Sequence, residues 1–249
     1  MRTIRRISAA FRLLDSYSKG PVLGAAILVD GRRTPYVAKG DGTYVFSDLP
    51  PVPHAYEISA PGYRTVRRSL PAVPPHFPEV VLMPYAPGTP ALERISCFRL
   101  RFLRGERPLA EKKIRATLMT AVGALRLVEP GEKGGRALAL AGGYAQGLLY
   151  QHYCARENPA SDLFITDYDQ GTGQFLLQSP LETPLKKGGL LRPVWDLETD
   201  WDGAAVLPAI GLFLQREEVE LSFTLEGQEQ RLLTAPPSPS LRAVVEFEP

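Results

Sequence analysis

The side chains in this sequence best suited to chemistry are acidic, and they gather in two short stretches. Asp167 and Asp169 lie two residues apart in "DYDQGTG". The second stretch, "DLETDWDG", has an acid at every other position: Asp196, Glu198, Asp200 and Asp202. Calcium binds six to eight oxygens, and an EF-hand loop needs a bidentate acid at its twelfth position. Counted from Glu198, that position is Ala209. Polar turns between strands are the preferred interpretation, so no metal and no cofactor are expected.

Nucleophilic catalysis finds no support in the sequence. The histidines are His54, His76 and His152, and none lies in a Ser or Cys nucleophile motif. No Gly-rich loop has the ending that a phosphate loop requires. Cys97 and Cys154 are too few for a disulfide framework and lack metal-ligand spacing. We therefore expect a protein that is not an enzyme, with two buried free thiols.

Two tryptophans offer a route to binding. Trp195 and Trp201 flank "DLETD". An exposed Trp beside acids on a β-sandwich can stack on a sugar ring, whereas packing in a core or at an edge is the commoner use of Trp. Both interpretations stay open, and Trp195, Trp201, Asp167 and Asp169 form the candidate binding surface.

Composition limits the partners. The net charge of +2 is too small to indicate nucleic-acid binding, and 44% hydrophobic content is typical of a globular protein. No apolar run is long enough for a signal sequence or a membrane span, so a cytoplasmic location is expected. Proline supplies 24 of the 249 residues, about twice the usual ~5%. That much proline favours short strands joined by rigid turns.

The stretch "KGDGTYVFSDLPP" shows the pattern of such a strand. Asp41 and Gly42 suit the tight turn of a β-hairpin, because glycine adopts positive φ without strain. Tyr44 and Phe46 then share one face of the strand, with Val45 on the other. The sequence therefore predicts a strand with Tyr44 and Phe46 in a core.

"GPVLGAAILVDG", "GDGTYVFSDLPP", "YEISAPGYRTVRRSL" and "EVVLMP" follow one another in the order of a known family. Together they resemble a carboxypeptidase regulatory-like (transthyretin-like) domain over residues 5–85. The resemblance implies a small Greek-key β-sandwich of about seven strands. The chain departs from the family in "PAVPPHF" and "PPVPHAY", both of which lie in loops.

The second half of the chain repeats the order of features found in the first. "TDWDGAAVLPA" parallels "KGDGTYVFSDLPP", and each is followed by a Gly turn, a Pro-rich bend and a final apolar strand. We therefore expect a first domain at 1–85, a linker at 86–93 and a second sandwich at 94–249 with an insertion at about 120–195. The same register predicts a strand within "LAEKKIRATLMTAV" (109–122), although its residues favour a helix.

The predicted fold class is all-β: two tandem Greek-key (transthyretin- or immunoglobulin-like) sandwich units, the second with a β-rich insertion. Such units supply stiff surfaces that bear loops. We expect a non-catalytic structural or interaction protein, an accessory subunit of a large bacterial or phage-derived assembly such as a phage tail or a contractile injection system. Its partners would be other protein subunits. The alternative is a module that binds carbohydrate or a cell surface, with a glycan as its ligand. Both functions are analogies at the level of the fold.

Overall fold

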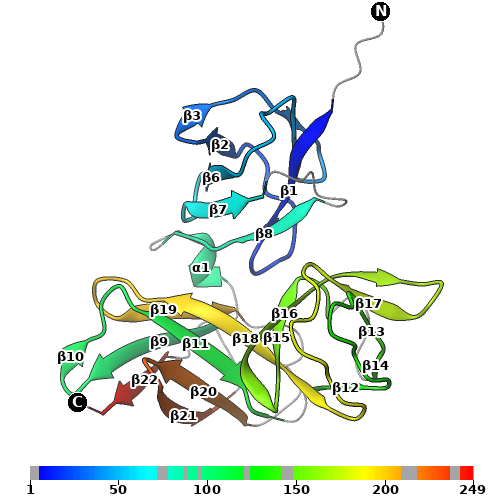
Figure 1. Cartoon of the computed structure of the whole chain (residues 1–249). Helices are drawn as coiled ribbons and strands as arrows, with labels where there is room; N and C mark the ends of the chain where they lie inside the picture. Colours follow the sequence, from blue (N-terminus) through cyan, green and yellow to red (C-terminus); the bar gives the residue numbers. More distant parts are fainter. Residues whose placement is uncertain are drawn as a thin grey trace, which may run out of the picture. The chain divides into compact units, whose positions relative to one another are not determined.

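The computed structural model describes residues 6–71, 78–86, 89–94, 97–120, 124–141, 148–208, 218–235 and 242–248. In these ranges the chain is nearly all β, and the described helix is the short α1 (Ala91–Arg94) (Figure 1). The chain divides into two compact units, unit 1 (Met1–Glu93) and unit 2 (Arg94–Pro249). None of the described helical residues forms a segment long and apolar enough to cross a membrane.

Unit 1 is built from two four-stranded sheets. One has the order β4-β5-β1-β8 and the other β3-β2-β6-β7. β1 pairs with β5 antiparallel and with β8 parallel, while β6 pairs antiparallel with both β2 and β7. The strands are β1 (Ile7–Asp15), β2 (Ala26–Val29), β3 (Arg32–Arg33), β4 (Val37–Ala38), β5 (Thr43–Ser47), β6 (His54–Ser59), β7 (Val66–Leu70) and β8 (Glu79–Met83).

Aromatic residues dominate the core between these two sheets. Phe11 of β1 meets Tyr56 of β6 with ring centroids 4.8 Å apart, and Phe46 of β5 meets the same tyrosine at 5.8 Å. Tyr44 is also buried, and its hydroxyl donates a hydrogen bond to the carbonyl of Val22 at 3.2 Å. Edge-to-face contacts of this kind add about 0.5–1.5 kcal/mol each beyond the burial of apolar area. The prediction that Tyr44 and Phe46 lie in a core is confirmed.

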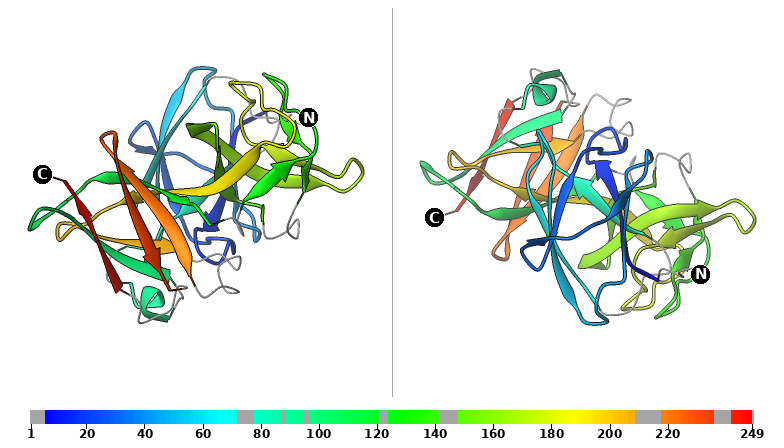
Figure 2. Two further views of the ribbon diagram at one scale, coloured as in Figure 1. Left: turned by 90° about the horizontal axis from the view of Figure 1, so that it is seen from below. Right: turned by 90° about the horizontal axis from the view of Figure 1, so that it is seen from above.

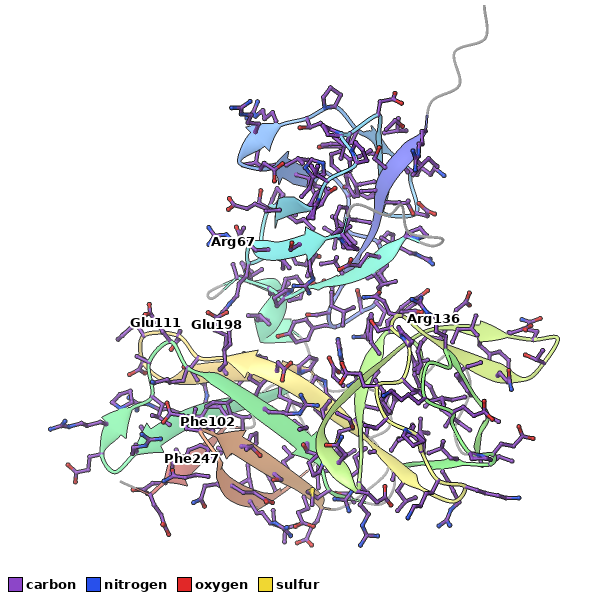
Figure 3. All side chains as sticks on the ribbon, in the orientation of Figure 1. Arg67, Phe102, Glu111, Arg136, Glu198 and Phe247 are labelled. Carbon is purple, nitrogen blue, oxygen red and sulfur yellow. The ribbon has the colours of Figure 1, made fainter. Side chains whose placement is uncertain are left out.

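Unit 2 has a small sheet formed by β10, β9, β19 and β22, and a ten-stranded sheet that contains β11, β18, β20 and β21. Phe102 and Phe247, labelled in Figure 3, belong to the core between the two sheets. The strands are β9 (Cys97–Arg104), β10 (Arg107–Pro108), β11 (Lys113–Leu118), β12 (Leu125–Leu127), β13 (Ala137–Leu138), β14 (Leu140–Ala141), β15 (Gln151–Ala155), β16 (Asn158–Asp169), β17 (Gln174–Leu177), β18 (Leu190–Glu198), β19 (Ala204–Pro208), β20 (Val219–Leu225), β21 (Gln228–Thr234) and β22 (Arg242–Phe247).

The strands common to both units pair in the same way. In unit 2, β9 pairs with β19 antiparallel and with β22 parallel, as β1 does with β5 and β8 in unit 1. β20 pairs antiparallel with β11 and β21, as β6 does with β2 and β7. The segment 109–122 contains the strand β11 with Ile114, Ala116 and Leu118 buried, which confirms the strand predicted there.

The strands between β11 and β19 close on themselves. β12 pairs with β18 and β14, β13 pairs with β17, and the sheet continues through β16 and β15 back to β18. Because β13 and β14 are separated by a single residue, these pairings form a closed ring with its own apolar core. The ring lies at the end of the large sheet opposite β20 and β21 (Figures 1 and 2). Closure leaves few strand edges open to pairing with other chains.

Two antiparallel pairings in this region join segments that a Gly-rich turn separates. β12 and β14 pair antiparallel across "EPGEKGG", and β16 and β17 pair across "DQGTG". The stretch 144–158 allows a helix or a strand on sequence grounds. Its described part contains the strand β15, and residues 144–147 lie outside the described residues. Residues 87 and 88 of the predicted linker also lie outside them.

Candidate interaction surface

The first acidic stretch is a turn that its own side chains hold in place. Asp169 Oδ1 accepts a hydrogen bond from the backbone N–H of Gly171, and its Oδ2 accepts one from the hydroxyl of Thr172, both at 2.8 Å. The Thr172 hydrogen bond lowers the pKa of Asp169. Asp167 Oδ1 accepts from the backbone N–H of Tyr168 at 2.8 Å. Both predicted site residues therefore bond to their local backbone and turn. Across the described residues, no group of three or more His, Cys, Asp or Glu side chains could hold a metal ion.

The histidines that the structure describes bond to carboxylates. His152 lies 2.7 Å from Asp162, and its ring stacks on Phe164 with centroids 4.2 Å apart. Cys154 follows on the same strand, where burial raises the pKa of its thiol. A raised pKa disfavours the thiolate that a nucleophile needs. Both Cys97 and Cys154 are free and buried, as the sequence predicts.

The two predicted site tryptophans differ completely in exposure. Trp195 of β18 is 8% exposed and belongs to the core of unit 2. Trp201 is 80% exposed. The described contacts bring neither of them to Asp167 or Asp169. Of the four residues of the candidate surface, Trp201 is the one whose side chain is both large and open to a partner.

The alternation along β18 carries the signal that separates the two tryptophans. Leu191, Trp195 and Leu197 are two or four residues apart and buried, whereas Asp196 and Glu198 between and beyond them are exposed. Side chains along a strand point alternately to its two faces. Val194 on the other face is buried as well, so the informative part of the strand is its end, where Trp195 and Leu197 alternate with the exposed Asp196 and Glu198.

Trp201 lies in a turn whose backbone is held by hydrogen bonds of the residues before and after it, Asp200 and Asp202. Asp200 Oδ1 accepts hydrogen bonds from the backbone N–H groups of Asp202 at 2.9 Å and of Ala204 at 2.8 Å. Arg101 of β9 donates to the Asp202 carboxylate at 2.7 Å. Gly203 is buried, and a Cβ there would lie 2.6 Å from the carbonyl oxygen of Phe102. The turn therefore presents the indole from a rigid support.

The same turn occurs in unit 1 without the tryptophan. Gly42 N–H donates to the Lys39 carbonyl at 3.2 Å, as Gly203 N–H does to the Asp200 carbonyl at 3.1 Å. In this alignment Gly40 occupies the place of Trp201, and a Cβ on Gly40 would meet nothing within 4 Å. The position thus faces open space in both units, and only unit 2 fills it with a large apolar side chain.

Comparisons with known proteins add no family or function. No family model and no curated protein matches the sequence. Among solved structures, the chain is similar to the Bacillus anthracis TIE protein with a TM-score of 0.26 and 8% sequence identity. The alignment covers 98% of this chain and 33% of that one. A similarity this weak supports no argument, so the proposals below rest on the residues of this chain.

Proposed function

We propose that the chain is a non-catalytic structural and interaction protein, an accessory subunit of a large bacterial or phage-derived assembly such as a phage tail or a contractile injection system. The observation that carries this proposal is Trp201, an 80% exposed indole held on a rigid turn. Trp is among the residues that most often dominate the binding energy of protein interfaces. Contact between the apolar indole and water is unfavourable, and a partner that covers the indole would gain the free energy of burying it.

We further propose that the two units are copies of one Greek-key sandwich, and that unit 1 belongs to the transthyretin-like class. The shared strand pairing supports this, as does the buried glycine at the same place in each unit. A Cβ on Gly42 would lie 2.7 Å from the Leu13 carbonyl oxygen, and one on Gly203 would lie 2.6 Å from that of Phe102. A repeated sandwich gives a stiff body, which suits a structural subunit better than a mobile active site.

The test is co-migration with the assembly. A tagged chain produced in its source organism should sediment with a high-mass particle. Trp201→Ala should move most of it to the low-mass fractions. Leu233→Ala is the matched control, because Leu233 is another exposed apolar residue of unit 2 (62% exposed) and should leave sedimentation unchanged. A wild-type chain found only in the low-mass fractions would contradict the proposal.

A second candidate is glycan binding, and the same exposed indole favours it, because an indole can stack on the apolar face of a sugar ring. Affinity electrophoresis in gels that contain a soluble polysaccharide separates the two functions. A glycan-binding module would be retarded as a monomer, and Trp201→Ala would restore its mobility. Unretarded migration across neutral and acidic polysaccharides would remove this candidate.

A further inference from the structure

A shallow hollow of about 430 Å³ lies on the outer surface of unit 1, over the pair β6 and β7. Its small lining residues are Gly31, Ala55 and Ser69. Ala55 and Ser69 are directly paired across the two strands, and both are exposed. With no large side chain at these places, the surface is indented where the two strands meet. The volume lies within the range of about 300–1,000 Å³ that accommodates a bulky organic group.

Arginines border this hollow. Arg67 and Arg68 line it, and Arg67 extends away from unit 1 into solvent (Figure 3). Arg68 is paired with Tyr56 across the strands and lies 3.6 Å from Glu79, so Arg67 is the guanidinium that the hollow offers to a partner. Arg67 Nε lies 3.0 Å from a carboxylate oxygen of Glu57, which also lines the hollow, so this ion pair compensates part of the arginine's charge and fixes one edge of its guanidinium. The Arg67 side chain nevertheless remains 81% exposed. A guanidinium held in this way offers its flat face for stacking on an aromatic ring, and Trp is the best aromatic partner for such a contact.

The turn that bears Trp201 has the opposite electrostatic character. Asp200 and Asp202 flank the indole, and Glu111 lies beside them, since its N–H donates to the Asp200 carbonyl at 3.3 Å. Glu111 and Glu198 lie at the same end of unit 2 (Figure 3). Arg101 is paired with Asp202 at 2.7 Å, and Lys113 lies directly opposite Glu198 across β11 and β18, so these charges largely compensate one another. The acidic surplus at this turn comes from Asp200 and Glu111, and it suits an exposed guanidinium such as that of Arg67.

The charges of the two units follow the same division. Residues 1–93 contain 11 Lys and Arg against 7 Asp and Glu, while residues 94–249 contain 18 against 20. The net charges are thus +4 and −2. Opposite net charges steer the unlike units of two molecules toward each other and disfavour contact between like units.

We infer that copies of this chain associate head to tail, with Trp201 of one copy seated in the unit 1 hollow of the next, against Arg67. This inference rests on the proposed interaction role of Trp201 and names its partner. The two surfaces are different, so the contact is heterologous. Such contacts generate rings when the rotation closes and open filaments when it does not.

Sedimentation velocity of the full chain across a wide concentration range tests the inference. The wild type should form larger species as concentration rises, and added salt should weaken them because the exposed charges are screened. Trp201→Ala should weaken association at least about tenfold, the size of effect expected for a central interface tryptophan. Leu233→Ala should leave it unchanged.

A mixing experiment tests the head-to-tail geometry itself. Ala55→Trp fills the hollow and leaves Trp201 in place, whereas Trp201→Ala removes the indole and leaves the hollow open. Each variant alone should sediment as a monomer. An equimolar mixture should give a one-to-one dimer and nothing larger, because only one Trp201 and one open hollow remain to combine. Circular dichroism spectra that match the wild type confirm that both variants fold.

Several outcomes would overturn the inference. A wild type that stays monomeric at every concentration would do so, as would a mixture that stays monomeric while the wild type associates. A monomer whose Trp201 is protected from acrylamide quenching would show that the indole docks within its own chain. If the wild type is monomeric yet Trp201→Ala still releases it from the high-mass particle, self-association fails while the proposed function stands.

Discussion

At the scale of single residues, the contacts of His54 indicate that its imidazole is protonated and joins two loops of unit 1. Its Nδ1 lies 2.6 Å from Asp30 Oδ2 and its Nε2 lies 3.0 Å from the Pro50 carbonyl. A carboxylate and a carbonyl only accept hydrogen bonds, so both ring nitrogens must donate, and only the imidazolium has two donors. The hydrogen bond to Asp30 raises the pKa of His54, and the same bond lowers the pKa of Asp30.

These shifts set a pH dependence for the stability of unit 1. The raised pKa of His54 stabilises the fold fully below the unfolded value of about 6.5, and this contribution disappears as pH rises through the folded pKa. The lowered pKa of Asp30 acts in the opposite sense, because its contribution is present above the unfolded pKa and is lost as pH falls through the folded one. The gap in urea midpoint between wild type and His54→Gln should therefore be widest in mildly acidic solution and should shrink at alkaline pH. A difference in urea midpoint that grows as the pH rises would refute the protonated state of His54.

The two tryptophans give a second prediction at this scale. Trp201→Ala should change the free energy of unfolding by less than about 0.5 kcal/mol, as is usual for exposed sites. Trp195→Ala should cost about 3–5 kcal/mol, because it empties part of the core of unit 2. In acrylamide quenching, Trp201→Phe should remove the accessible component of the fluorescence and Trp195→Phe should leave it. Equal quenching of both variants would contradict the difference in burial.

At the scale of elements, the buried glycines before β5 and β19 should be irreplaceable. Gly42 has φ of 80° and Gly203 has φ of 74°. Alanine at either place would add backbone strain of about 1–3 kcal/mol and would bring its Cβ against a carbonyl oxygen. Urea unfolding should show a loss of about 2 kcal/mol or more for each variant. Gly40→Ala is the control, since its Cβ would meet nothing within 4 Å and stability should hardly change.

Local pattern predicts strands well and predicts the contacts between them poorly. The strand at β11 follows from the register between the two halves, although residue propensity favours a helix. In each unit a side-chain hydrogen bond joins the end of the first strand to a distant hairpin turn, and the sequence does not predict this bond. In unit 1 the hydroxyl of Tyr63 donates to Asp15 at 2.8 Å, and in unit 2 Arg104 donates to Glu226 at 3.1 Å. The two hydrogen bonds occupy equivalent positions in the two units but use different residue types, so no sequence motif shared by the units predicts them.

The candidate surface shows the same limit. Sequence names Trp195 and Trp201 together, and burial in the structure separates them, since Trp195 belongs to a core and Trp201 is exposed. The hollow beside Arg67 leaves no such signal, because Gly31, Ala55 and Ser69 are ordinary small residues that meet only through the pairing of β6 and β7 and the turn after β2. A hollow that forms because neighbouring strands carry small side chains can be recognised only once the pairing of the strands is known.

At the scale of the whole molecule, each unit has its own core and its own pair of sheets. Because each unit has a core of its own, we expect the two units to unfold separately. Both tryptophans lie in unit 2, so intrinsic tryptophan fluorescence reports on unit 2 alone. The tyrosine-rich core of unit 1 is instead reported by near-ultraviolet circular dichroism and by amide NMR signals.

Separate unfolding can therefore be tested in the intact chain with the two glycine variants. Gly203→Ala should lower the urea midpoint measured by tryptophan fluorescence. Gly42→Ala should leave that midpoint in place and should instead lower the midpoint of the amide signals from unit 1. If Gly42→Ala shifts the fluorescence midpoint as far as Gly203→Ala does, the two units unfold as one cooperative body.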